Sequence, residues 1–316
     1  MVLEDFARFV GSTRPAAALV ADDFAKYRHR LTRRGLGGRQ GLSPYALTRA
    51  ITVVRGMFRR AYEDDLIDHP VKYNKSFDKP TATQKRKSRR AAEHDNGKRL
   101  FEPAEMIALI KAPPSPLRAM VLMGINGGFG NNDCARLPMS SVNWTDGVIE
   151  FDRPKTGIER IVPLWPETIE AVRESLKNRP NPATEGYQDL LFLTPEGTPW
   201  VRQYVHHPSG DEMQTVNTMV ADILGMRFRT LIRKLGFKRK GLGFYALRHT
   251  FRTWADEVKD QHAIHRIMGH VIPGMSGVYV EAISLERLRA VTDQVRQKLF
   301  ASPAAPALSE PPAVEK

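Results

Sequence analysis

Three residues in the second half of the chain could together do chemistry on a phosphodiester. Arg248 lies in the segment ALRHT, His270 closes the segment MGH, and Tyr279 follows nine residues later. An arginine offers a fork of charged donors to the non-bridging phosphate oxygens, where negative charge must be held during attack. A phenol can be the attacking group and later the leaving group. The sequence therefore predicts a phosphoryl-transfer site with Arg248 as the stabilising cation and Tyr279 as the nucleophile.

The charge of the chain favours a polyanionic partner. Its 316 residues hold 48 Lys and Arg against 35 Asp and Glu, a formal net charge of +13 and a pI near 9.9. Such a balance is typical of proteins that bind nucleic acid, although a basic protein without such a partner can carry the same net charge. The length favours two domains over one.

The one cysteine, Cys134, cannot form an internal disulfide, and the segment MVLED at the start is unlike a secretory leader. No apolar run approaches the roughly 20 residues that cross a bilayer. We therefore expect a cytoplasmic, nucleoid-associated protein with no membrane partner.

Residues 1–78 are expected to form a helical DNA-binding domain. Ser43 followed by Pro44 is typical of a helix start, and apolar residues recur at helical spacing from Leu47 to Tyr62. An earlier helix is expected near residues 22–31. The outer face of the longer helix is a candidate DNA-binding surface, with a solvated bundle face as the alternative. Its candidate residues are Arg49, Arg55, Arg59 and Arg60.

Residues 79–99 lose the apolar periodicity and are interpreted as a basic interdomain linker. Basic side chains here could follow a phosphate backbone and release its counterions, or they could belong to a solvated tether. The candidate DNA contacts are Lys85, Arg86, Lys87, Arg89 and Arg90.

Residues 100–300 are expected to form a second, mostly helical domain, and the alanine- and proline-rich tail at 301–316 is expected to be disordered. Alternating residues at 147–151 and 160–164 predict an antiparallel hairpin, and a short strand is expected at 190–193. The fold class is thus mainly α with a small antiparallel β-sheet. Apolar spacing predicts helices at 103–110, 117–125, 167–177, 219–235, 246–258, 261–268 and 285–299.

With these features the chain resembles the tyrosine recombinase family, also called phage integrases, over most of its length. The likeness lies in a helical core-binding domain followed by an α+β catalytic domain that opens with FEPAE. It implies a site-specific DNA recombinase or integrase, in which a tyrosine makes a 3′-phosphotyrosyl link and a freed 5′-hydroxyl reverses that step. It also implies double-stranded DNA as partner, a homo-tetramer on DNA joined through the helix at 285–299, and no metal or nucleotide cofactor.

The resemblance assigns a role to each of four residues. Lys155, in the segment RPKTGIERIVPL, matches the general acid of the family's hairpin, and Arg248 matches the second arginine that clamps the phosphate. His270 matches the histidine of a Leu-Gly-His-like segment, and Tyr279 matches the nucleophile. Each has a structural alternative by itself: an exposed hairpin lysine, a helix salt bridge, a helix cap and a buried aromatic. Their joint order favours the catalytic interpretation.

Two positions depart from the family pattern. Tyr245 stands where the family usually has histidine, and a phenol can donate a hydrogen bond but cannot become a cation near neutral pH. Gly130 stands where the first clamp arginine is expected. Loss of one charged donor costs about a hundred- to a thousand-fold in rate. The backbone of GGFGNN could cradle the anion instead, although a tight turn with an Asn N-cap is the favoured interpretation, and Arg136 or Arg118 could reach in.

These departures leave three hypotheses. The first is an active recombinase. The second is a catalytically impaired relative that acts as a DNA-binding accessory or regulatory factor, and the third is an enzyme that relaxes supercoiled DNA by the same tyrosine chemistry. Histidines at 206, 207, 262, 265 and 270 lack a recognised ligand spacing, so no metal is expected.

Overall fold

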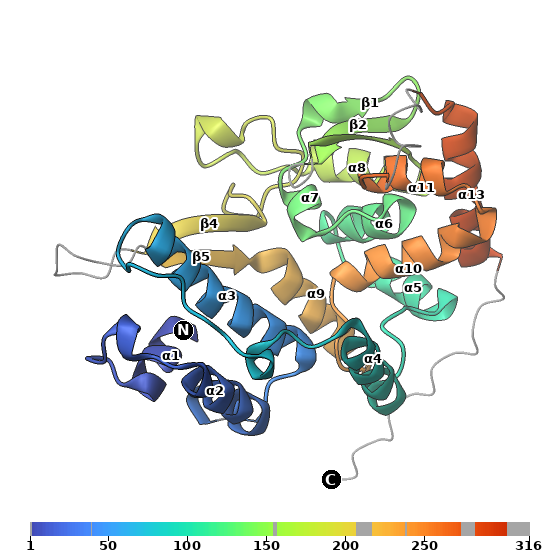
Figure 1. Cartoon of the computed structure of the whole chain (residues 1–316). Coiled ribbons are helices and arrows are strands. Elements are labelled where there is room, and N and C mark those ends of the chain that lie inside the picture. The colour runs from blue at the N-terminus through green and yellow to red at the C-terminus, as the bar shows by residue number, and fades with distance from the viewer. Residues whose placement is uncertain are drawn as a thin grey trace, which may run out of the picture. The chain divides into compact units, whose positions relative to one another are not determined.

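The computed structural model describes residues 2–38, 40–153, 157–206, 217–237, 239–272 and 282–301. The chain divides into two compact units, Met1–Gly97 and Lys98–Lys316. The described part is mainly helical with small antiparallel sheets, which confirms the predicted fold class (Figure 1). None of its helices is long and apolar enough to cross a membrane.

The amino-terminal unit is built around aromatic side chains. Phe24 packs against Phe6, Phe58 and Phe77, with ring centroids 5.3–5.6 Å apart, and all four side chains are buried. Ser43 caps the long helix as predicted, since its Oγ accepts a hydrogen bond from the backbone N–H of Ala46. The helices of this unit are α1 (Val2–Val10), α2 (Ala21–Arg34), α3 (Pro44–Glu63) and α4 (Ala82–Asn96).

Helix α4 occupies most of the segment that lacks apolar periodicity, and none of its residues is buried. A reciprocal cap starts it: the backbone N–H of Gln84 donates to Thr81 Oγ1, and that of Thr81 donates to Gln84 Oε1. Alanine, lysine, arginine and glutamine are strong helix formers, so a helix forms here without a face to bury. The expected linker at 79–99 is thus helical over most of its length, and the domain bounds stay a prediction.

The carboxyl-terminal unit joins two small sheets to a larger set of helices. Its helices are α5 (Pro103–Lys111), α6 (Leu117–Gly127), α7 (Asn131–Ala135), α8 (Pro166–Lys177), α9 (Ile223–Lys234), α10 (Tyr245–Ala255), α11 (Gln261–Met268) and α13 (Leu285–Phe300). Its strands are β1 (Val142–Asn143), β2 (Val148–Arg153), β3 (Ile158–Pro163), β4 (Val201–His206) and β5 (Asn217–Asp222). Helix α6 is buried along its length from Ala119 and contacts α5, α8, α10 and α13 (Figure 1).

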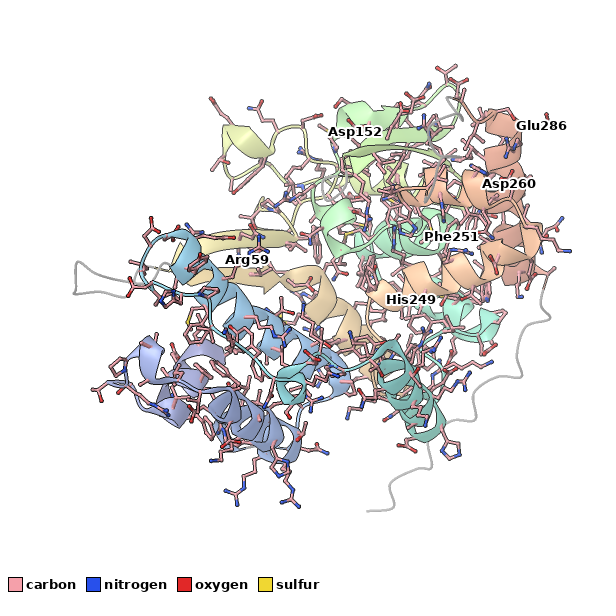
Figure 2. All side chains as sticks on the ribbon, viewed as in Figure 1. Arg59, Asp152, His249, Phe251, Asp260 and Glu286 are labelled. Carbon is pink, nitrogen blue, oxygen red and sulfur yellow. The ribbon has the colours of Figure 1, made fainter. Side chains whose placement is uncertain are left out.

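The predicted hairpin is confirmed, and its register decides which side chains face inward. Strand β2 pairs antiparallel with both β1 and β3, with Phe151 opposite Arg160 and Arg153 opposite Ile158. Because side chains alternate along a strand and opposed residues share a face, Arg153 and Arg160 lie on the same face as Phe151. Asp152, between Phe151 and Arg153 in sequence, is exposed on the other face (Figure 2).

Two expected elements differ in the structure. The helix predicted at 219–235 begins only at Ile223, because residues 217–222 pair with β4 and Asp222 caps the helix through the N–H of Gly225. The strand predicted at 190–193 was wrong: only isolated bridges occur there, Pro138 with Leu190 and Leu193 with Pro199. Its backbone bonds instead go to loops, as from the N–H of Leu191 to the carbonyl of Leu137. The β4–β5 pair was not predicted.

Candidate active site

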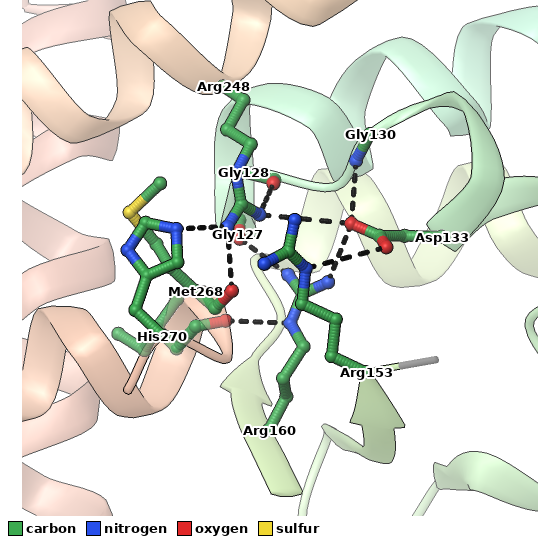
Figure 3. Close-up of polar contacts among 10 residues, drawn as sticks. Gly127, Gly128, Gly130, Asp133, Arg153, Arg160, Arg248, Met268 and His270 are labelled. Atoms are coloured by element: carbon green, nitrogen blue, oxygen red, sulfur yellow. Dashed lines mark hydrogen bonds and ion pairs between the residues drawn. The ribbon is translucent and has the colours of Figure 1, made fainter. Parts of the chain in front are cut away.

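A buried carboxylate, Asp133, lies at the centre of the site. It sits in the short helix α7, where its Oδ2 accepts the backbone N–H of the N-cap residue Gly130 at 2.9 Å. Three arginines surround it, and we call Asp133, Arg153, Arg160 and Arg248 the Asp133 cluster. Figure 3 shows the three guanidinium groups converging on this one carboxylate from two strands and a helix.

Arg160 of β3 is the structural member of the cluster. Its side chain is fully buried, with Nη1 3.0 Å from Asp133 Oδ2, and it donates from Nε to the Ile267 carbonyl and from Nη2 to the Gly127 carbonyl, both at 2.9 Å. Its guanidinium also lies 4.0 Å from the ring centroid of Phe129. Burial and then the neighbouring arginines lower the pKa of Arg160 to about 10, partly offset by Asp133. The residue stays charged at neutral pH and ties β3 to α6, α7 and α11.

Arg248 of α10 is almost as deeply buried, at 2% exposure. Its Nη1 donates to the Gly128 carbonyl at 2.5 Å, while Nη2 donates to the Met268 carbonyl and contacts His270 Nε2, both at 2.7 Å. Asp133 Oδ2 is 3.7 Å from its Nη1. Burial, and next Arg153, lowers the pKa of Arg248. These contacts hold Arg248 beside His270.

His270 follows α11 and is half-buried. Burial first, and then the charges of Arg248 and Arg153, lower the pKa of His270 to about 4. A guanidinium can only donate, so His270 Nε2 must accept from Arg248. The ring is therefore neutral at pH 7, with its proton on Nδ1.

Arg153, at the end of β2, is the least satisfied member of the cluster. Its side chain is 11% exposed and its Nε lies 3.9 Å from Asp133 Oδ1, a long ion pair. The Nε is buried and has no hydrogen-bond partner among the described residues. Unlike Arg160 and Arg248, Arg153 also lines an open pocket of ≈ 580 Å³.

The pocket brings together several residues that the sequence singled out. Gly130, Arg136 and Tyr245 line it together with Arg153, and Asp222 contributes a carboxylate to its wall. Tyr245 is 51% exposed and interacts electrostatically with Arg248, which raises the pKa of that arginine against the effect of burial. The pocket therefore has cationic and phenolic groups facing solvent, an arrangement suited to an anion.

Of the expected site residues, the structure brings Gly130, Tyr245, Arg248 and His270 to one place. Lys155 and Tyr279 lie outside the described residues. Arg118 is turned to another partner, with its Nη1 3.7 Å from Glu174. The expected Asn cap at the glycine-rich turn was wrong, because Gly130 is the N-cap of α7 and Asn131 is the first helical residue.

Sequence reasoning had assigned no role to Arg153 or Arg160. A signal for both was present, since each is a charged residue in phase with the apolar positions of its strand: Phe151 before Arg153, and Val162 after Arg160. A charge on the buried face of a strand requires a partner, and here that partner is Asp133.

The candidate DNA contacts of the amino-terminal unit are mostly exposed. Arg59 and Arg60 pair with Glu63 and Asp64 one helical turn on, and these are solvent-exposed pairs of small energy (Figure 2). Arg55 differs: it binds the Phe77 carbonyl and Asp78 and lies 4.9 Å from the ring centroid of Tyr73. It therefore holds the loop after α3. The exposed candidates also include Arg49, Arg86, Lys87, Arg89 and Arg90, while Lys85 is partly buried.

No group of three or more metal-ligating side chains occurs among the residues that the structure describes. Cys134 is fully buried, and burial raises the pKa of its thiol well above the usual value. It is an inert core residue.

The fold and the site together define a class of protein: a helical unit and an α+β unit, with three arginines converging on one buried carboxylate beside an open pocket. The family model described as the phage integrase family matches residues 93–284, more than half of the chain. The chain therefore belongs to the phage integrase family, the tyrosine recombinases. Among curated protein sequences none matches it.

Solved structures show the same fold. The Tn1549 transposon integrase in complex with circular intermediate DNA is 18% identical over 92% of this chain and 90% of that chain, with a TM-score of 0.59. XerH site-specific recombinase bound to palindromic difH substrate is 16% identical over 92% and 75%, with a TM-score of 0.58. A lambda integrase dimer bound to a COC′ core site is 13% identical over 90% and 89%, with a TM-score of 0.56.

Proposed function

We propose that this protein is a site-specific DNA recombinase that cleaves and rejoins duplex DNA through a 3′-phosphotyrosyl intermediate. Family membership supports a DNA strand-exchange enzyme in general terms, and it favours a recombinase over a DNA-binding accessory factor. The observation that carries the proposal is the pairing of Arg248 with His270 beside an open pocket, within the matched range that also holds Lys155 and Tyr279.

In this proposal the chemistry needs no metal and no nucleotide. The Tyr279 phenol passes its proton to solvent water and attacks phosphorus, the bond to the 5′-oxygen breaks, and Lys155 supplies the proton that this oxygen takes. Arg248 and His270 bind non-bridging oxygens and hold the charge that builds on them. A 5′-hydroxyl from the partner strand then attacks phosphorus and the phenol leaves, so the number of phosphodiester bonds is conserved.

Tyr245 has a narrower role than the histidine it replaces. Its phenol can donate one hydrogen bond to a phosphate oxygen, but it brings no charge at neutral pH. Its electrostatic interaction with Arg248 supports a position beside the same anion. We assign to it orientation of the phosphate.

The proposed partner is double-stranded DNA, which the Tn1549, XerH and lambda enzymes bind in the structures described above. Exposed arginines on α3 and the basic helix α4 would contact the phosphate backbone, and we place the protein at the nucleoid. A homo-tetramer on DNA is part of the proposal, with α13 contacting the neighbouring protomer. Buried residues on α13 such as Leu288 and Val295 also pack within their own unit, so an exchange of this helix would repeat existing contacts.

Covalent trapping tests the assignment of Tyr279. Wild type, Tyr279→Phe and the control Tyr187→Phe are incubated with nicked duplexes tiled across the DNA that flanks the gene, and protein–DNA adducts are resolved on a denaturing gel. We expect adducts with wild type and Tyr187→Phe and none with Tyr279→Phe, while all three bind the same duplexes.

Each other outcome has a distinct meaning. An adduct that persists in Tyr279→Phe would exclude this tyrosine as the nucleophile. Salt-sensitive binding without any wild-type adduct would favour the impaired relative. Relaxed circles without exchanged strands would point to a relaxing enzyme.

A further inference from the structure

Gly130 leaves a gap in the pocket where a charged side chain could stand. A Cβ built on it would lie 3.6 Å from Asp133 Oδ2 and 3.7 Å from the Tyr245 ring, which are ordinary contact distances. Its φ of −94° is open to any residue. Glycine is thus required here neither by the backbone nor by lack of space, and the position supplies no cation.

Arg153 brings a cation to the same pocket from another element. It comes from the end of β2 and lines the pocket with Gly130 and Tyr245. Its guanidinium points toward the Asp133 carboxylate (Figure 3). The Cβ that Gly269 lacks would come within 3.0 Å of Arg153 Cβ, so the base of the side chain is held against the residue before His270. The Cβ of Arg153 is therefore held in place by packing, while the side chain lines the pocket.

The charges of the Asp133 cluster do not balance. Three guanidiniums surround one carboxylate, an excess of two positive charges in a largely buried place. Asp133 Oδ2 is taken by the Gly130 N–H and Arg160, which leaves Oδ1 and a 3.9 Å pairing for Arg153. Because buried like charges repel, such an excess is stabilised when an anion binds next to it.

Other arginines near the site fit this role less well. Arg160 already donates from all three of its nitrogens, and Arg118 pairs with Glu174. Arg136 lines the pocket but is exposed, and it makes no contact with Asp133 among those found in the described residues. An exposed, solvated cation stabilises an anion less than a largely buried one does.

We propose that Arg153 is a further catalytic residue, whose guanidinium binds a non-bridging oxygen of the scissile phosphate and supplies the charge that Gly130 does not. This inference rests on the proposed function. In the step written above, negative charge builds on that oxygen as the Tyr279 oxygen bonds to phosphorus and the 5′-oxygen leaves. Arg153 and Arg248 hold the charge from two sides, and neither gains nor loses a proton.

The first test compares single substitutions in the trapping assay. Loss of a charged donor to this phosphate is expected to slow adduct formation by Arg153→Ala about a hundred- to a thousand-fold. Arg136→Ala tests the competing arginine, and Arg173→Ala, an exposed arginine of α8 that packs on Trp144, controls for the loss of one charge. Wild-type rates for Arg153→Ala, or a larger loss in Arg136→Ala, would overturn the proposal.

The second test moves the charge. The double variant Arg153→Ala with Gly130→Arg should regain at least ten-fold of the lost rate, because the new side chain starts from another element that lines the same pocket. A structural role for Arg153 predicts no such rescue. It also predicts a lower thermal midpoint for Arg153→Ala, whereas we expect an unchanged or raised midpoint, since removing one of three like charges relieves repulsion.

A third measurement does not depend on cleavage. Inorganic phosphate is titrated into wild type, Arg153→Ala and Arg173→Ala, and binding is followed by phosphorus NMR. We expect Arg153→Ala to weaken binding several-fold and Arg173→Ala to leave it unchanged. Phosphate binding through Arg153 without any wild-type adduct would refute the proposed function while keeping Arg153 as a phosphate ligand. If the wild type cleaves and Arg153→Ala cleaves equally well, the proposed function stands and the role of Arg153 is refuted.

Discussion

The contact with Arg248 fixes which nitrogen of His270 is the acceptor. Because Arg248 can only donate, the histidine nitrogen that faces it must be an acceptor, and burial together with three neighbouring arginines keeps the ring neutral. In this state Nε2 is occupied by Arg248. To donate a hydrogen bond to a phosphate from Nε2, the ring must release Arg248 and carry a proton on that nitrogen, and a bound anion favours this change by offsetting the cationic field.

At the scale of single residues, we predict that His270 makes the free energy of unfolding depend on pH. Its folded-state pKa of about 4 lies below the ordinary value of 6.5, so the stability it contributes is fully present above about pH 6.5 and is lost as the pH falls toward 4. The loss should be about 1–2 kcal/mol, after allowance for partial exposure of the ring. Urea unfolding of wild type and His270→Gln between these pH values measures it, and a smaller pH dependence is expected in the variant.

A histidine far from the cluster provides the control. His94, whose side chain is 90% exposed on α4, can be replaced by Gln to account for the loss of an imidazole as such. An NMR titration of the His270 ring in the free protein gives the direct value. A midpoint near 6.5 would contradict the field that the Asp133 cluster is argued to exert.

At the scale of elements, the turn after α11 returns the chain to the site. Gly269 ends α11 in the left-handed region, at φ +60°, and so aims His270 back at Arg248. A Cβ there would lie 2.7 Å from Arg160 Cγ, closer than packing allows. Helix α11 can therefore pack this closely on strands β2 and β3 only because residue 269 is a glycine.

Two glycine substitutions separate packing from backbone conformation. Gly157 has nearly the same φ, +62°, and no described residue comes within 4 Å of a Cβ built on it. Gly157→Ala should cost about 1 kcal/mol for the left-handed residue alone. Gly269→Ala should cost about 1–3 kcal/mol more, because Arg160 must move. Equal free energies of unfolding for the two variants would show that the contact of α11 with β3 is not tight.

At the scale of the whole molecule, the two units have separate hydrophobic cores. Residues such as Phe24 and Phe58 form one, and residues such as Leu122 and Phe251 form the other, with no residue in common. A unit that buries its own core needs no partner unit to fold. The sequence between them, which includes α4, belongs by its contacts to the amino-terminal unit.

Separate fragments should therefore fold. Residues 98–316 alone should unfold cooperatively in urea, with a free energy of unfolding of about 5–15 kcal/mol, and residues 1–97 should fold as a smaller, less stable helical unit. Circular dichroism of each fragment, compared with the full chain, tests this. Fragment 98–316 without a cooperative transition would mean that the two units stabilise each other.

The sequence by itself determined the class of fold, the helix limits set by strong local signals, and the order of the candidate catalytic residues. Ser43 with Pro44, the alternation at 147–151 and the apolar period of residues 261–268 all act within one turn or one strand, so they could be predicted locally. The β4–β5 pair could not, because its pairing depends on contacts between segments and its sequences, VRQYVH and NTMVAD, do not alternate apolar with polar residues.

Only the tertiary structure decided which charges meet. Arg153 and Arg160 are seven residues apart, Asp133 is 27 residues before Arg160, and Arg248 is 115 residues beyond Asp133. Nothing in local spacing says that their side chains share one place. The pleat of β2 and β3, the cap of α7 and the turn at Gly269 bring them together, because a buried charge folds only with its partner present.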